Sequence, residues 1–246
     1  KPGPNLGTQP VYRLNSSVEP IGAYTPRELK PESVTSYEIG YKGLIAKKLL
    51  IDVYYYTGEY QNFIGRTLVA KPSALVPTSN TIYSIVENAA TMSGDGSGGV
   101  KIDPVKVKNS GYGIGLDYRV TSGLSFFANY FHDELGNVPS DFIAQFNTPG
   151  HRLNAGIGHS GFGKTKRVVF NVTGRWQNEF LWEAEFATGT VPSFFTMDAM
   201  IGYRFPSIGS LMKLGATNVL NKYYMNGYGN PQIGGLYYVS FAYNIF

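Results

Sequence analysis

The chain has no cysteine, which excludes disulfide bonds and metal sites built on thiolates. No stretch approaches the ~18 consecutive apolar residues that a transmembrane helix needs, so helical membrane spans are excluded too. Charged residues make up only 15% of the chain, and the net charge of +4 is spread along it, which indicates a solvated surface and no nucleic-acid-binding face. The chain opens on Lys-Pro-Gly-Pro, with neither an initiator Met nor a signal peptide. We therefore expect either processing at this end or a place within a larger protein.

Aromatic residues and glycine are abundant. The 246 residues include 19 Tyr, 15 Phe and 30 Gly, and 43% of them are hydrophobic. Tyr and Phe are enriched in β-strands, and their abundance without long apolar runs predicts an all-β protein. The length allows one or two domains. Membrane-spanning strands remain possible, because each needs only about 9–11 residues.

Strict alternation of apolar and polar residues organises the chain. In the stretch 33–63, Tyr37, Ile39 and Tyr41 alternate with polar or very small residues, and the pattern resumes after a tight connection at 43–48. Successive side chains of a strand point to opposite faces of a sheet, so this period of two predicts a β-hairpin. The same pattern predicts seven more strands, at 112–120, 124–130, 153–158, 168–177, 197–205, 211–219 and 237–245.

The connections between these strands alternate in length. Residues 1–32, rich in Pro, Gly and Ser, read as a loop segment on the extracellular side, and residues 33–246 read as the barrel portion. An antiparallel up-and-down meander would place all short turns at one end and all long loops at the other, as in outer-membrane β-barrels. The short connections are 43–48, 121–123, 160–166 and 206–210, and the long ones are 64–106, 135–149, 180–193 and 221–235.

One face of each predicted strand is apolar and ends in aromatics, and the other carries Asp, Arg, Asn and Gly. A soluble barrel would place the apolar face inside, and alternation alone does not separate the two cases. Aromatic strand ends, loop asymmetry and the small or charged second face favour a transmembrane barrel with a polar interior. Nine strands cannot close as a single-chain bacterial barrel, which has an even number of strands. We therefore expect the C-terminal portion of a larger barrel.

Several motifs resemble those of TonB-dependent receptors. The sequence LKPE at 29–32, followed by SYEIGYKG at 36–43, resembles the "L-x-P-E … Y-E-x-G-x-K" signature of that family, and ATNVLNKYY at 216–224 resembles its "N-L-x-D/N-K-x-Y" segment. The resemblance implies a 22-stranded, plugged outer-membrane barrel of a Gram-negative bacterium, of which this chain would supply the last nine strands. The plug and the TonB box are not in this sequence. The terminal Phe246 is out of phase with the alternation of the last strand, which indicates either a bulge in that strand or a terminal residue beyond the bilayer.

The function that this resemblance implies is active uptake. Extracellular loops would capture a small-molecule substrate, most often a ferric siderophore, and the TonB complex would act through the absent plug region; outer-membrane lipid would be the other partner. A passive porin, or a soluble all-β carbohydrate-binding protein, are the alternatives. No catalytic group, metal site, cofactor or nucleic-acid partner is expected, because no nucleophile–base set, carboxylate pair or phosphate loop stands out.

Candidate ligand-binding residues lie at the long-loop ends of the strands. Three tyrosines on the predicted lumen face could stack on a ligand or pack against the plug. Two histidines and an arginine could meet at the mouth of the barrel, as a transient metal or ligand contact or as an ordinary polar rim. A further Arg and Gln on the lumen face could contact an anionic ligand. In order, these residues are Tyr54, Tyr56 and Tyr60; His132, His151 and Arg152; and Arg175 and Gln177.

Overall fold

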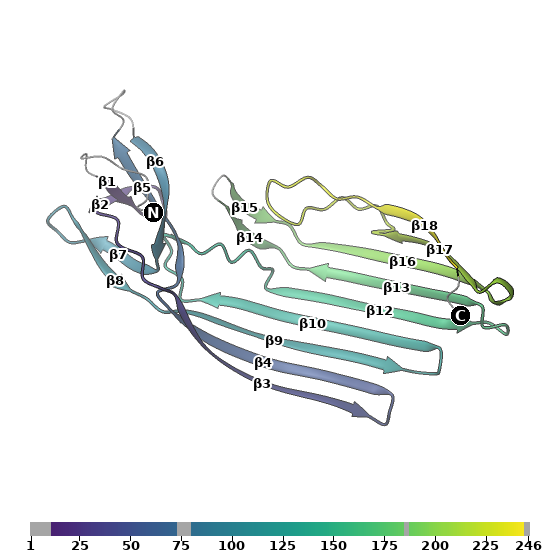
Figure 1. The fold of residues 1–246 in the computed structure, drawn as a ribbon. Coiled ribbons are helices and arrows are strands. Elements are labelled where there is room, and N and C mark those ends of the chain that lie inside the picture. The colour runs from purple at the N-terminus through teal and green to yellow at the C-terminus, as the bar shows by residue number, and fades with distance from the viewer. Residues whose placement is uncertain (1–10, 73–79, 185–186, 244–246) are drawn as a thin grey trace.

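The computed structural model describes residues 11–72, 80–184 and 187–243, and its largest element is one antiparallel nine-stranded sheet (Figure 1). The sheet order is β18-β17-β16-β13-β12-β10-β9-β4-β3, so each strand pairs with its neighbours along the meander. All nine predicted strands are confirmed. They are β3 (Ser33–Ile45), β4 (Leu49–Gln61), β9 (Val107–Arg119), β10 (Leu124–Gly136), β12 (His151–Phe162), β13 (Val168–Gln177), β16 (Phe194–Phe205), β17 (Ser210–Thr217) and β18 (Leu236–Tyr243).

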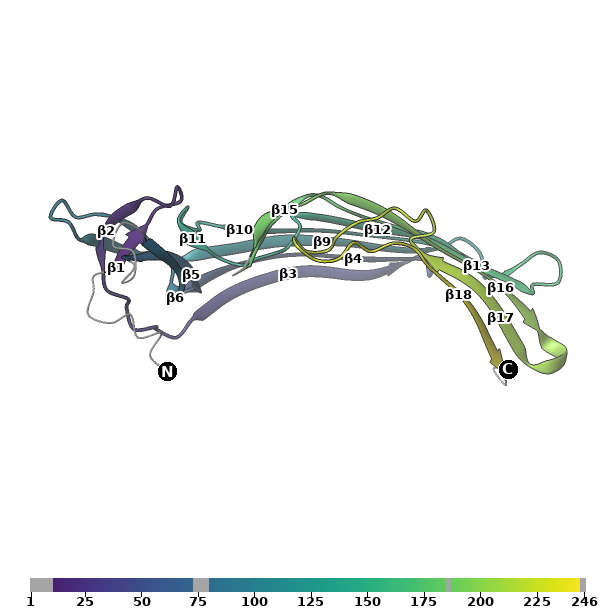
Figure 2. The same cartoon turned by 90° about the horizontal axis from the view of Figure 1, so that it is seen from above.

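The sheet is bent like a trough and is open at both edges. In Figure 2 the sheet curves so that its two edge strands, β3 and β18, lie toward the lower side of the picture relative to the strands between them. Among the described residues β3 pairs only with β4, and β18 pairs only with β17, so the nine strands do not close on each other. Ile245 and Phe246 lie outside the described residues, so the phase of Phe246 relative to the last strand stays a prediction from the sequence.

Cross-strand pairing confirms the two faces predicted from alternation. Val172 of β13 lies opposite Ile157 and Ala199, and its sequence neighbour Thr173 lies opposite Gly156 and Asp198. The first row is apolar throughout and the second is polar or small. Large apolar side chains on the first face stay exposed, for example Ile39 at 74% and Val239 at 68%. We call the apolar face outward and the polar face inward.

A small folded unit, here called the head, lies beyond the long-loop end of the sheet (Figure 1). Five strands form its sheet, in which β5 pairs with β6, β1 and β11, and β1 also pairs with β2; the β7–β8 hairpin packs against this sheet. The bounds are β1 (Val11–Leu14), β2 (Pro20–Tyr24), β5 (Ile64–Pro72), β6 (Asn80–Asn88), β7 (Ala90–Gly94), β8 (Val100–Pro104) and β11 (Phe142–Ile143).

The head corrects two sequence-based expectations. The expectation that residues 1–32 are loop is wrong for the strands between Val11 and Tyr24. The connection 64–106, expected only as a long loop between barrel strands, contains the strands β5 to β8. β1, β2, β7 and β8 have four or five residues each, so period-two alternation is too brief to recognise. In β5 and β6, of nine residues each, adjacent apolar pairs break the alternation, Leu68–Val69 and Ile85–Val86. Tertiary packing stabilises them: Val11, Tyr24 and Val69 are buried in one hydrophobic cluster.

The remaining connections contain less structure. The long connection after β13 holds a hairpin, β14 (Phe180–Glu183) with β15 (Thr188–Val191), and the short one after β16 is a single 3-10 turn at Pro206–Ile208. Gly209 ends that turn with φ of 57°, a left-handed conformation that glycine adopts without strain. In the described part of the chain, no helix has the length and apolar character to cross a bilayer.

Candidate ligand-binding face of the barrel wall

A hydrogen-bonded group of three side chains lies on the inward face near the long-loop end. The hydroxyl of Tyr56 donates a hydrogen bond of 2.6 Å to Oδ1 of Asp133. The guanidinium of Arg152 forms an ion pair with the other oxygen of the same carboxylate. Arg152 also lies over the ring of Phe131, with its central carbon 5.6 Å from the ring centroid, a cation–π contact. Three strands, β4, β10 and β12, therefore meet in one polar cluster.

Glycine in the intervening strand β9 makes this contact possible. Tyr56 lies opposite Gly111, and Gly111 lies opposite Asp133. A Cβ at Gly111 would stand 2.7 Å from the ring of Tyr56, and one at Gly113 would stand 2.4 Å from the ring of Tyr54. A larger residue at Gly111 or Gly113 would therefore displace these rings from the sheet. The small residues are needed so that the tyrosines can lie flat across β9.

A second ion pair lies on the same face, one strand further along. Nη2 of Arg175 is 2.5 Å from Oδ2 of Asp198, and Gln177 lies opposite Arg152 in the sheet register. The side chains of Arg152 and Arg175 are 41% and 52% exposed, whereas both aspartates are mostly covered. Each guanidinium has five N–H donors, more than its aspartate uses, and the exposed fraction of each side chain leaves part of the guanidinium accessible on the inward face. This arrangement suits non-covalent binding of an anionic or flat aromatic ligand.

The structure separates the other three candidates from this group. Tyr60 packs against Phe63 in a T-shaped contact with ring centroids 5.3 Å apart, within the cluster that buries Val107. His132 and His151 meet, as expected, with stacked rings 4.5 Å apart. They lie in the row of the outward face, however, and do not face the same side as Arg152.

Sequence reasoning left three members of the inward group out of the candidate ligand-binding residues: Asp133, Asp198 and Phe131. Alternation places Asp133 and Asp198 on the polar faces of their strands, so the signal for their orientation was present. Their partners were not readable, because Tyr56 and Asp133 are 77 positions apart and come together only through the register of β4, β9 and β10. No group of three or more His, Asp or Glu side chains suited to a metal ion occurs among the described residues.

The head contains a buried cluster of charged side chains. Arg13 and Glu87 are each 1% exposed. Arg13 pairs with Asp141 at 2.9 Å, and Arg27 pairs with Glu87 at 3.2 Å. The second oxygen of Glu87 is buried without a hydrogen-bond partner in the described structure. Burial raises the pKa of the Glu87 carboxyl from 4.5 to about 7, and the charge of Arg13 opposes this rise only in part.

This raised pKa predicts that the head loses stability as the pH rises. The folded head holds the Glu87 proton more tightly than the unfolded chain, so its free energy of unfolding is highest below pH 4.5 and falls until about pH 7. We expect a decrease of roughly 1–3 kcal/mol across this range. Hydrogen exchange of β5 and β6 amides, corrected for intrinsic rates, measures it. Glu87→Gln should remove the dependence; a slope that persists in this variant would contradict the assignment to Glu87.

A meandering antiparallel sheet with an apolar outward face and a polar inward face defines the wall of a transmembrane β-barrel. The model of the family described as "TonB dependent receptor-like, beta-barrel" matches residues 4–221. The chain therefore belongs to the family of TonB-dependent receptor β-barrels, and its place is the outer membrane of a Gram-negative bacterium.

Comparison with solved structures shows the same fold at low sequence identity. The ferripyoverdine receptor of the outer membrane of Pseudomonas aeruginosa is 18% identical over 93% of this chain, with a TM-score of 0.56. The copper transporter OprC is 14% identical over 88%, with a TM-score of 0.62, and the iron transporter FrpB of Neisseria meningitidis is 14% identical over 89%, with a TM-score of 0.56. This chain spans 28%, 32% and 33% of those three proteins, respectively. No curated protein gives a significant match.

Proposed function

We propose that this chain forms part of the wall of a receptor that takes up a scarce nutrient by TonB-dependent active transport. Membership of the family supports dependence on TonB, and the polar inward face supports movement of a solute through the interior of a barrel. In this proposal the barrel is completed by strands outside this chain, which pair with the open edges of β3 and β18. A plug domain, also outside this chain, closes the pore until the TonB complex moves it.

The substrate we propose is a ferric siderophore or a similar iron complex. The observation that carries this choice is the inward group at the long-loop end, where two half-exposed arginines lie on one face and one of them, Arg152, lies over the ring of Phe131. Many iron complexes of this kind are anionic and carry flat aromatic groups, for which guanidinium and Tyr or Phe rings are suitable partners. Two of the three similar structures reported above belong to proteins described as a ferripyoverdine receptor and an iron transporter.

Uptake of radioactive ferric siderophore by cells with and without the full-length receptor tests the proposed function. We expect uptake to require the receptor and to stop when TonB is deleted or the proton gradient is collapsed. Uptake that continues without a proton gradient would indicate a passive porin and would contradict active transport. No uptake of any iron complex, with growth still dependent on the receptor, would contradict the proposed substrate class.

Removal of one arginine is expected to weaken binding of an anionic iron complex. Arg175→Gln should raise Kd about tenfold, because it removes a charge-assisted hydrogen-bond donor from the inward face. Titration of the purified full-length receptor with the ferric siderophore measures this change. Lys213→Gln is the matched control: Lys213 lies in an inward-facing row at the short-turn end, opposite Gly202 and Ser240. Equal weakening by both changes would argue against a binding site at Arg175.

A further inference from the structure

Four ring side chains cluster on the outward face near the long-loop end. His132 and His151 stack at 4.5 Å, and Tyr112 lies 5.1 Å from His132. The hydroxyl of Tyr130 is 2.7 Å from Nδ1 of His151. Tyrosine at this level is expected of an aromatic girdle. An aromatic girdle does not account for two adjoining basic side chains, since charged groups on the lipid face are unfavourable toward the bilayer centre. The histidine pair therefore points to a polar partner at the membrane boundary.

The hydrogen bonds of the two rings leave one edge of each available. Nδ1 of His132 is 2.7 Å from the carbonyl oxygen of Gly150, which can only accept, so this nitrogen carries a hydrogen. Nδ1 of His151 is engaged by Tyr130. Neither Nε2 has a hydrogen-bond partner in the described part of the chain; the nearest charged atom to that of His132 is Oε2 of Glu134, at 3.9 Å. When protonated, each Nε2 offers an N–H donor to an anion.

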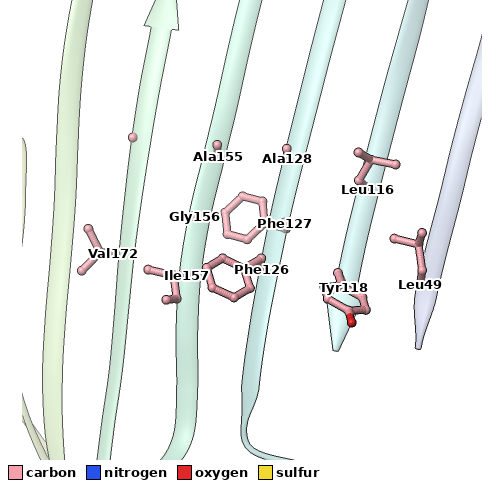
Figure 3. A pocket seen from close by; sticks show the side chains of 11 residues that line it. Leu49, Leu116, Tyr118, Phe126, Phe127, Ala128, Ala155, Gly156, Ile157 and Val172 are labelled. Atoms are coloured by element: carbon pink, nitrogen blue, oxygen red, sulfur yellow. The ribbon is translucent and has the colours of Figure 1, made fainter. Parts of the chain in front are cut away.

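An apolar groove lies on the same face below this cluster. Three small residues, Ala128, Ala155 and Gly174, lie side by side on β10, β12 and β13, and Phe126 and Ile157 rise next to them toward the short-turn end (Figure 3). The groove has a volume of about 660 Å³, and its lining is almost entirely apolar. Because it lies on the surface that faces the hydrocarbon of the outer membrane, an acyl chain is the occupant that its chemistry fits.

The spacing between the histidine pair and the apolar groove matches the dimensions of a single lipid molecule. Ala128 and His132 are four residues apart on the same face of β10, about 13 Å along the strand. This distance is less than half of the roughly 30 Å hydrocarbon thickness of a bilayer. The cluster is at the long-loop end, which is extracellular in barrels of this class. A phosphate held at the histidines would therefore belong to a lipid of the outer leaflet whose acyl chain runs down into the groove.

We propose that His132, His151 and the groove over Ala128, Ala155 and Gly174 form a binding site for lipopolysaccharide, with a lipid A phosphate at the histidine pair and an acyl chain in the groove. Binding here is independent of transport through the interior, because the site is on the opposite face of the sheet from Arg152 and Arg175.

The charges around the pair are compatible with a phosphate. Lys106 and Glu59 neutralise each other in an ion pair of 2.6 Å, and Lys108 and Glu134 on the same side carry opposite charges. The titratable and charged groups on this side of β4, β9, β10 and β12 near the pair are Glu59, Lys106, Lys108, Tyr112, Tyr130, His132, Glu134 and His151.

The test uses the full-length receptor, purified in detergent and incubated with bisphosphorylated lipid A. Bound lipid is counted by native mass spectrometry. We expect His132→Gln/His151→Gln to weaken retention about tenfold, and Ala128→Leu/Ala155→Leu, which fills the groove, to weaken it by a similar factor. Phosphate-free lipid A should bind the unmodified receptor as weakly as bisphosphorylated lipid A binds the histidine variant.

Two matched controls separate the site from the rest of the lipid face. His159→Gln changes the third histidine, which is on the outward face at the short-turn end, opposite Leu124 and Phe170. Ile201→Phe adds bulk on the outward face away from the groove. Both should retain lipid A like the unmodified receptor. The proposal would be overturned if a control variant lost as much lipid A as the site variant it is matched to, or if neither site variant lost any. Equal binding of phosphatidylglycerol and lipid A would overturn it too.

Discussion

Arginine in place of Val172 is expected to lower the free energy of unfolding of the barrel by about 2–4 kcal/mol. Val172 is in the middle of β13, on the outward face between Ile157 and Ala199. A guanidinium there must leave water for hydrocarbon, and no acidic side chain faces it from either neighbouring strand. The expected loss of unfolding free energy arises from moving the charge into hydrocarbon. The substitution therefore tests which face of the sheet meets lipid.

Thr173→Arg is the matched control for this prediction. Thr173 is the next residue of β13 and lies on the inward face, opposite Asp198, so a new guanidinium would meet water and a carboxylate. We expect a change of well under half that of Val172→Arg. Denaturant unfolding of the full-length receptor refolded into lipid vesicles measures both. Equal losses at the two positions would contradict the assignment of the outward face to lipid.

Loss of Arg13 is expected to destabilise the head by about 3–5 kcal/mol. Its guanidinium donates to the backbone oxygen of Leu68 at 3.0 Å and pairs with Asp141, and its Nε is 3.1 Å from the sulfur of Met92. Arg13 thereby joins β1 to β5, to β7 and to the connection that follows β10. In Arg13→Met, the carboxylates of Asp141 and Glu87 would remain largely buried without this cation.

Limited proteolysis and hydrogen exchange of the head measure this loss, while the nine-stranded sheet provides an internal reference. Lys101→Met is the matched control, because the Lys101–Asp103 pair is mostly exposed and such pairs contribute little. We expect Arg13→Met to open the head and leave protection of β10 and β12 unchanged. Head protection that survives Arg13→Met would show that the buried ion pair is dispensable.

The barrel strands were predictable because their pattern is local. Alternation in 168–177 places Val168, Phe170 and Val172 on one face from sequence alone, since the direction of each side chain follows from its position in the strand. The structure confirms this face for β13 and the corresponding face for the other strands in which alternation defines one. The inward orientation of Tyr54, Tyr56, Arg175 and Gln177 follows in the same way.

The head was not predictable by this route. Its strands β1, β2, β7 and β8 have four or five residues each, too few to show a clear period, and Pro and Gly mark them as loop. They exist because non-local contacts bury Val11, Tyr24 and Val69 together and satisfy Arg13 with groups as far away as Asp141.

The sequence by itself determined the class of the fold, the two faces of each strand and the family resemblance, because each depends on residues close together in the chain. Only the tertiary structure decided which side chains meet. Tyr56 reaches Asp133 across Gly111, and His132 stacks on His151 on the side away from Arg152. The physical reason is that partners on neighbouring strands are fixed by the register of the sheet, and register is set by the backbone pairing of whole strands and not by any local pattern.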